Sequence, residues 1–180
     1  QLIHEVLRKA TIDRSIQPVM CGSALHGIGV QPVLDAVQYY LPSPQERPPV
    51  EGEVVGKGKK SEKGTISRKP EASEAFCGLV FKILAEKHGD IALLRVYSGT
   101  LKAGSRAWNP ERQRKENIAQ LWHVQADRRE QVASCSAGDI IGVIGPRQSV
   151  TGDTLCDAQS PIVLESIDFP ETVISMAIES

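Results

Sequence analysis

The feature that most constrains this chain is a series of short apolar runs, separated by turn residues, that begins near residue 73. Two of the runs, FCGLVFKIL (76–84) and IALLRVYS (91–98), flank the polar stretch EKHGD. Further turn signals follow at SG, KAG, NPE, AGD and TGD, between residues 98 and 153. The run ENIAQLWHV (116–124) fits a helix or a strand, and the turns around it favour a strand. Strands spaced in this way indicate a sandwich or a barrel rather than βαβ units.

The first 44 residues follow a different pattern, in which helical and strand-like segments alternate. Apolar side chains recur at helical spacing over residues 2–10, and again at Val30, Val33, Leu34, Val37 and Leu41. Pro32 suits the first turn of the second helix. Between the helices, IQPVMC (16–21) predicts a short strand at a sheet edge, because Pro18 lacks a backbone N–H. Helix, strand, loop and helix make an α/β piece.

Composition separates these two regions and sets limits on function. Residues 46–72 are rich in Pro, Gly and Lys and predict a basic connector, solvated and mobile, with a phosphate-contacting tether as the alternative. The net charge of −1 restricts any nucleic-acid contact to a local patch. No apolar run reaches the roughly 18 residues of a membrane span, so we expect a cytoplasmic protein. The first residue is Gln1 and the last residues alternate as a strand, so we expect a segment of a longer protein.

Familiar catalytic and metal-binding patterns do not occur in the sequence. GKGKKS (56–61) lacks the Gly that a phosphate loop needs before its Lys, and no N-K-x-D is found. DIIG (139–142) lies among β turns and is interpreted as a turn. The four cysteines include no C-x-x-C pair and are predicted to be buried thiols, and the four histidines pair with no nucleophile. We therefore predict no catalytic residue and no metal ligand in this chain.

GSAL (22–25) lies where a predicted strand leads through a loop into a helix. Open α/β sheets bind ligands at such positions, because backbone N–H groups are unpaired there. Ser23 and Ala24 are small enough for a flat base to approach the main chain, and Leu25 could cover its face. On these residues alone, a plain tight turn is the preferred interpretation.

The order of several longer motifs changes that balance. PVMCGSALHGIGVQPVLDAVQYYLPSP, RVYSGTLKAGS, ADRREQV, TGDTLCD and PIVLESIDFPETVISMAIES resemble the elongation factor G family of translational GTPases, along nearly the whole chain. The resemblance implies a mainly β fold, a translation-factor β-barrel preceded by an α/β piece of a P-loop GTPase domain. It implies the end of the G domain at 1–45, the connector at 46–72, barrel domain II at 73–166 and the first strand of domain III at 167–180.

The resemblance also implies a nucleotide site whose cofactors are GTP or GDP and Mg²⁺. Ser23, Ala24 and Leu25 match the family's guanine-contacting motif, in which the Ala24 N–H would donate to the guanine O6. The phosphate loop, the switch regions and N-K-x-D are not found in this sequence. We therefore expect that these 180 residues alone neither bind GTP tightly nor hydrolyse it.

For the barrel, the resemblance implies binding to the ribosome, in a protein that couples GTP hydrolysis to tRNA–mRNA movement and acts as a monomer. Basic residues are the candidate contacts to RNA of the small subunit, namely Arg95, Lys102, Arg112, Arg114, Lys115, Arg128 and Arg129. Three alternatives remain open: a ribosomal-protection protein, a class II release factor, and a barrel that only binds.

Overall fold

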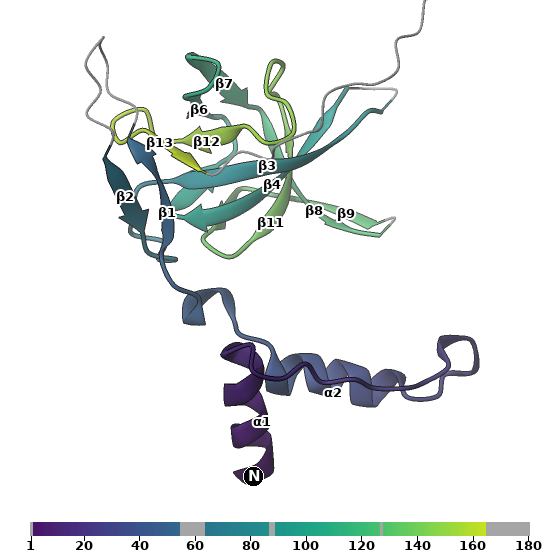
Figure 1. Cartoon of the computed structure of the whole chain (residues 1–180). Helices are drawn as coiled ribbons and strands as arrows, with labels where there is room; N and C mark the ends of the chain where they lie inside the picture. The colour runs from purple at the N-terminus through teal and green to yellow at the C-terminus, as the bar shows by residue number, and fades with distance from the viewer. Residues whose placement is uncertain (1, 55–63, 87–88, 127, 165–180) are drawn as a thin grey trace, which may run out of the picture. The chain divides into compact units, whose positions relative to one another are not determined.

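The computed structural model describes residues 2–54, 64–86, 89–126 and 128–164. Figure 1 shows a helical part at the N-terminus, followed by a curled arrangement of strands. The chain divides into two compact units, residues 1–47 and 48–180, and each is described here by itself. The fold is mainly β, as the turn-spaced runs predict.

The N-terminal unit contains both predicted helices. They are α1 (Leu2–Ile12) and α2 (Val30–Tyr40), and two short 3-10 turns accompany them, η1 (Ala24–His26) and η2 (Pro44–Glu46). The strand predicted at 16–21 is wrong, since within the described residues this segment pairs with no other strand. Among the described residues of this unit, the one isolated bridge joins Ser23 to Ile28. An apolar run becomes a strand only where a neighbouring strand satisfies its backbone groups.

Arg8 connects α1 to the end of α2 and to η2. Its guanidinium donates to the carbonyl oxygens of Tyr39 at 2.9 Å and Leu41 at 3.1 Å, which lie at the C-terminus of α2. It also donates to both Glu46 oxygens, at 2.6 and 2.7 Å. Arg8 therefore caps α2 and fixes the turn that follows it.

The second unit is built on an eight-stranded antiparallel sheet with the order β7-β6-β12-β3-β4-β11-β8-β9. Its longest strands, β3 (Cys77–Leu84) and β4 (Ile91–Ser98), are the two runs predicted most directly from the sequence. The others are β6 (Ser105–Asn109), β7 (Arg114–Ile118), β8 (Gln120–Gln125), β9 (Arg128–Val132), β11 (Ile140–Ile144) and β12 (Thr154–Cys156). A separate pair joins β5 (Thr100–Lys102) to β10 (Ser134–Ser136). The segment 116–124 is thus confirmed as strand, in β7 and β8.

The sheet curls around one apolar core. Leu94, Ile118, Leu121 and Val143 are all fully buried in it, and they come from four different strands. Alternate residues of β4 point into this core, which is the period-two pattern of a strand buried on one face. At Gly99, with φ of 71°, a Cβ would lie 2.5 Å from the backbone nitrogen of Phe76, so only glycine fits this turn.

A smaller sheet differs from the sequence expectation. Strand β1 (Val50–Val54) pairs with β2 (Thr65–Arg68) and with β13 (Ile162–Leu164), so both described ends of the predicted connector are strands. Ile162 and Leu164 pack there with the buried Cys77 and Cys156. The Lys and Gly content of this segment predicted a mobile connector. The strand that pairs with β1 is β13, which lies about a hundred residues later in the sequence, so no local pattern indicates the pairing. Residues 55–63 and the predicted strand at 167–180 lie outside the described residues.

Within the described residues, no helix is both long enough and apolar enough to cross a membrane.

Candidate functional site

The turn at residues 23–28 brings the three predicted base-contacting residues together. Ser23 is extended, with φ of −131° and ψ of 101°, and it exchanges two backbone hydrogen bonds with Ile28, at 2.9 and 3.0 Å. Inside this closed turn, His26 N–H donates to the Ser23 carbonyl and Gly27 N–H to the Ala24 carbonyl. Gly27 and Gly29 take positive φ values of 69° and 79°, which their lack of a Cβ allows.

This turn exposes an unpaired donor beside an apolar side chain. Ala24 opens η1, and among the described residues its N–H finds no backbone acceptor. The Leu25 side chain is 91% exposed. The backbone after the turn passes close to Cys21. Position 29 is a glycine, and a Cβ there would lie 3.0 Å from the Cys21 carbonyl oxygen. A free N–H next to an apolar cover is an arrangement that can receive the edge and the face of a planar base.

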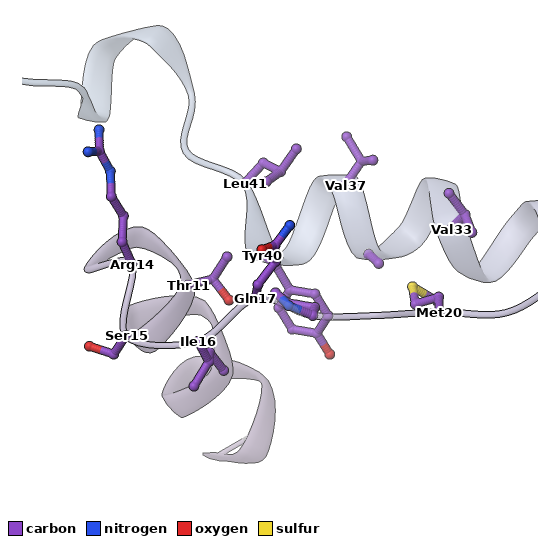
Figure 2. Close-up of a pocket in the computed structure, with 12 residues that line it drawn as sticks. Thr11, Arg14, Ser15, Ile16, Gln17, Met20, Val33, Val37, Tyr40 and Leu41 are labelled. Atoms are coloured by element: carbon purple, nitrogen blue, oxygen red, sulfur yellow. The ribbon is translucent and has the colours of Figure 1, made fainter.

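The N-terminal unit also has a separate apolar hollow of about 840 Å³. Figure 2 shows its lining, which comes from the end of α1, from residues 14–20 and from α2. Ser23, Ala24 and Leu25 are not among the lining residues. Val33 and Val37, on the predicted stripe of α2, remain 42% and 50% exposed. The stripe is therefore present as predicted, but it faces an open hollow.

Four of the predicted RNA contacts in the barrel have partners or lie apart from the rest. The Arg112 Nε lies 3.1 Å from the buried Asp153 carboxylate, and this hydrogen bond raises the pKa of Arg112. Arg129 pairs with Glu86 through two hydrogen bonds, which raise its pKa as well. The guanidinium of Arg95 lies 5.2 Å from the centre of the Tyr97 ring. Lys102 is exposed on β5. Arg112 and Arg129, which are paired with carboxylates, therefore have less net charge to offer an external anion.

The other basic candidates are not all in one place either. Arg128 is exposed on β9, next to Arg129. Arg114 and Lys115, on β7, instead line a hollow of about 940 Å³ between β7 and residues 144–148, which we call the basic cleft. Arg114 donates to the Gln148 side-chain oxygen at 2.6 Å, a neutral partner that leaves its charge uncompensated.

Arg147 also lines the basic cleft, although it was not among the predicted contacts. It lies 33 residues after Arg114, on a loop that begins at Gly145. Gly145 has φ of 130°, and a Cβ there would lie 2.2 Å from the Asn117 carbonyl oxygen. The glycine after strand β11 was the available signal, because it lets the loop fold back against β7.

The cleft also contains acidic groups, which reduce its charge. Arg114, Lys115 and Arg147 face Asp90 and Glu116, so the lining carries 3 − 2 = +1. Glu116 is only 5% exposed, and its oxygens accept hydrogen bonds from the loop. Elsewhere in the described part of the chain, no group of three or more His, Cys, Asp or Glu side chains could hold a metal ion.

Comparison with known proteins identifies the family. Residues 75–158 match the family model described as elongation factor G domain 2. Along 98% of its length, the chain is 46% identical to elongation factor G of Salinibacter ruber and 47% identical to that of Thermotoga maritima. It spans about a quarter of the length of these curated relatives, 25% in each case. The barrel therefore corresponds to domain 2 of the elongation factor G family, and the comparisons support the chain as a fragment of an elongation factor G.

Proposed function

We propose that this chain is a segment of a ribosomal translocase, a cytoplasmic GTPase that couples GTP hydrolysis to the movement of tRNA and mRNA. The observation that carries the proposal is the identity of 46–47% to elongation factor G, which extends over 98% of the chain. Both the turn at 23–28 and the barrel lie within this matched length. Each supplies one part of the proposed activity.

The first part is recognition of guanine by the turn. The Ala24 N–H is a donor without a backbone acceptor in the described structure, and guanine O6 is an acceptor. Adenine carries an amino donor at that position, and two facing donors leave both unpaired, at a cost of about 1–3 kcal/mol. Ser23 and Leu25 would hold the turn and cover the base. GTP and Mg²⁺, when bound, supply the phosphoryl-transfer chemistry.

A proline at position 24 tests this role, because it removes the N–H and little else. Ser23 is already extended, as a residue before proline must be, and the first position of a helical turn accepts proline. In the whole protein, Ala24→Pro should weaken GTP binding by roughly fivefold to a hundredfold, measured by calorimetry. Ala24→Ser keeps the donor and serves as the control. Equal affinity in the two variants would contradict the proposed contact.

The isolated 180 residues should neither bind GTP tightly nor hydrolyse it, because the turn supplies only the base-reading corner of the site. Calorimetry on this chain tests that expectation directly. Binding of GTP in the micromolar range by the chain alone would contradict it.

The second part is attachment of the barrel to RNA of the small ribosomal subunit, through the basic cleft. Arg114, Lys115 and Arg147 have no carboxylate partner among the described ion pairs, whereas Arg112 and Arg129 do. Free cations bind phosphates without reading sequence, and the affinity falls as salt rises. Sedimentation of the chain with small subunits at increasing salt should show this fall. An affinity that salt leaves unchanged would argue against the cleft.

Translocation itself is tested with the whole protein. It should move ribosomes by one codon on a messenger when GTP is present, as read by the position of the ribosome on the message. Release of tetracycline or of a finished peptide, without movement, would instead identify a ribosomal-protection protein or a release factor.

A further inference from the structure

Glu116 is the one carboxylate in the basic cleft that is buried, and the argument begins with its contacts. It lies on β7 between Lys115 and Asn117 and is 5% exposed. Its two oxygens accept the backbone N–H groups of Arg147 at 3.1 Å and Gln148 at 3.2 Å. The Ser149 hydroxyl donates to it as well, at 3.2 Å. One side chain therefore holds three consecutive residues of the opposite loop.

These three contacts fix the loop rather than pair with the cations. A carboxylate has about four acceptor sites, and three of those on Glu116 are taken by the loop. Among the described ion pairs, none joins Glu116 to a lysine or an arginine. Its negative charge is therefore directed at backbone dipoles, and the side chains of Arg114 and Arg147 remain available for an external anion.

The loop in turn orients the cleft. The Gln148 side-chain oxygen accepts from Arg114 at 2.6 Å, so the position of Gln148 sets the direction of the Arg114 guanidinium across the cleft. Gly145 brings the loop against the end of β7, where Ala119 N–H donates to the Ile144 carbonyl at 2.8 Å. Between these two points, Glu116 holds the backbone of the loop that carries Arg147.

We propose that Glu116 is a positioning residue of the RNA-binding surface, which holds residues 147–149 so that Arg114 and Arg147 face the same phosphate backbone. This inference rests on the proposed function of the cleft. The partner is recognised by its phosphodiester charge. Glu116 contacts no phosphate itself and acts through the loop.

The variant that tests the inference is Glu116→Gln, which keeps the size of the side chain but replaces one acceptor oxygen with a donor group. The backbone N–H groups of Arg147 and Gln148 should then exchange with deuterium faster than in the unaltered chain. The variant also removes one negative charge from the cleft, but we expect binding to purified small ribosomal subunits to weaken severalfold at low salt, because the released loop no longer holds Arg147 in place. The plot of log affinity against log salt has a negative slope. Its magnitude should decrease by roughly 0.7–0.9, the value of one lost phosphate contact.

Glu111→Gln is the matched control for a purely structural effect. Glu111 also accepts a backbone N–H, from Thr154 at 3.0 Å, but it is not among the residues that line the cleft. We expect this variant to change the melting temperature without changing the salt slope. If Glu116→Gln changes only the melting temperature, as Glu111→Gln does, Glu116 is structural and the inference is wrong.

A double-mutant cycle separates this inference from the proposed function. If Glu116 acts through Arg147, then Glu116→Gln should have a smaller effect in the Arg147→Ala background than in the unaltered chain. Additive effects would overturn the positioning role while leaving the cleft as an RNA contact. If the unaltered chain fails to bind small subunits at any salt concentration, the proposed function fails, and the inference fails with it.

Discussion

The two units of this chain treat their apolar side chains in opposite ways. Neither α1 nor α2 contains a buried residue, and Leu34 on α2 is 63% exposed. The barrel instead buries a continuous cluster in which Leu94 and Leu121 have no exposed surface. Covering an exposed apolar stripe lowers the free energy of the protein, so the helical unit has favourable burial still to make. The barrel has already buried its apolar side chains in a core. The barrel is thus expected to be stable by itself, and the helical unit to open far more easily.

Thiol reactivity should show the largest difference between the two units. Cys21 is exposed in the helical unit, while Cys77, Cys135 and Cys156 are buried in the barrel. Burial raises the pKa of the Cys77 thiol to about 12 and those of Cys135 and Cys156 to about 11, so little reactive thiolate forms at neutral pH. A chromogenic disulfide reagent should modify one thiol in the folded chain and four in denaturant. Cys21→Ser should abolish the reaction of the folded chain, and rapid modification of a second thiol would show that the barrel opens.

Removal of a large core side chain should destabilise the barrel by about 2–5 kcal/mol, through lost burial and a residual cavity. Leu94→Ala is the suitable change, because Leu94 is fully buried between β3 and β11. Leu34→Ala in α2 is the control and should change stability by less than about 0.5 kcal/mol, since that side chain is already exposed. Urea denaturation followed by the fluorescence of Trp108 and Trp122 reports on the barrel, and far-ultraviolet circular dichroism reports on the helices. Equal losses in the two variants would contradict the difference between the units.

A buried polar network should contribute a smaller amount, about 1–3 kcal/mol. The Asp153 carboxylate accepts from the Asn109 side chain at 2.9 Å and from the Val150 N–H at 3.1 Å. Asp153→Ala leaves the buried Asn109 amide and the Val150 N–H without this acceptor, so the urea midpoint should fall. Asp157→Ala is the control, because Asp157 accepts the Gln159 N–H on the exposed surface. A similar small change in both variants would show that water replaces Asp153 without loss.

The sequence predicted elements well where the signal is local. The turn-bounded apolar run at 91–98 and the helical stripe at 30–41 give β4 and α2 nearly to the residue. The strand predicted at 16–21 failed, because being a strand depends on a neighbour that a single run does not specify. For the same reason β1 and β2 were missed: their sheet is completed by β13, which is distant in sequence.

The two candidate sites differ in the same respect, because one is local in the sequence and the other is not. Ser23, Ala24 and Leu25 are consecutive, so one turn had to bring them together. The seven basic residues predicted as RNA contacts are spread over the barrel, and charge alone could not tell which of them already have partners. Arg112 is paired with Asp153, while Arg147, which was not predicted, shares the cleft with Arg114. Long-range pairing of strands decides such neighbourhoods, and no local pattern encodes it.

The smallest predicted effect is a pair of opposite pKa shifts, one in each unit. In the helical unit, the hydrogen bonds from Arg8 and from the Ser43 backbone lower the pKa of Glu46 from 4.5 to about 2. The charged form is favoured in the folded state, so this contribution is complete above about pH 4.5 and is lost as the pH falls toward 2. In the barrel, burial raises the pKa of Glu111. Ionisation of Glu111 is therefore less favourable in the folded state than in the unfolded state, so folding stability decreases as the pH rises above 4.5.

Carboxyl carbon NMR over a pH titration measures both shifts in one sample. Arg8→Gln should return the pKa of Glu46 toward 4.5, because it removes the charged donor that contributes most to the shift. It should leave the pKa of Glu111 unchanged, since that shift arises from burial within the barrel. If Glu46 titrates near 4.5 in the unaltered chain, the Arg8 contact is not held in solution. The helical unit would then lack its best-defined polar contact, and the difference in order between it and the barrel would be larger than the structure indicates.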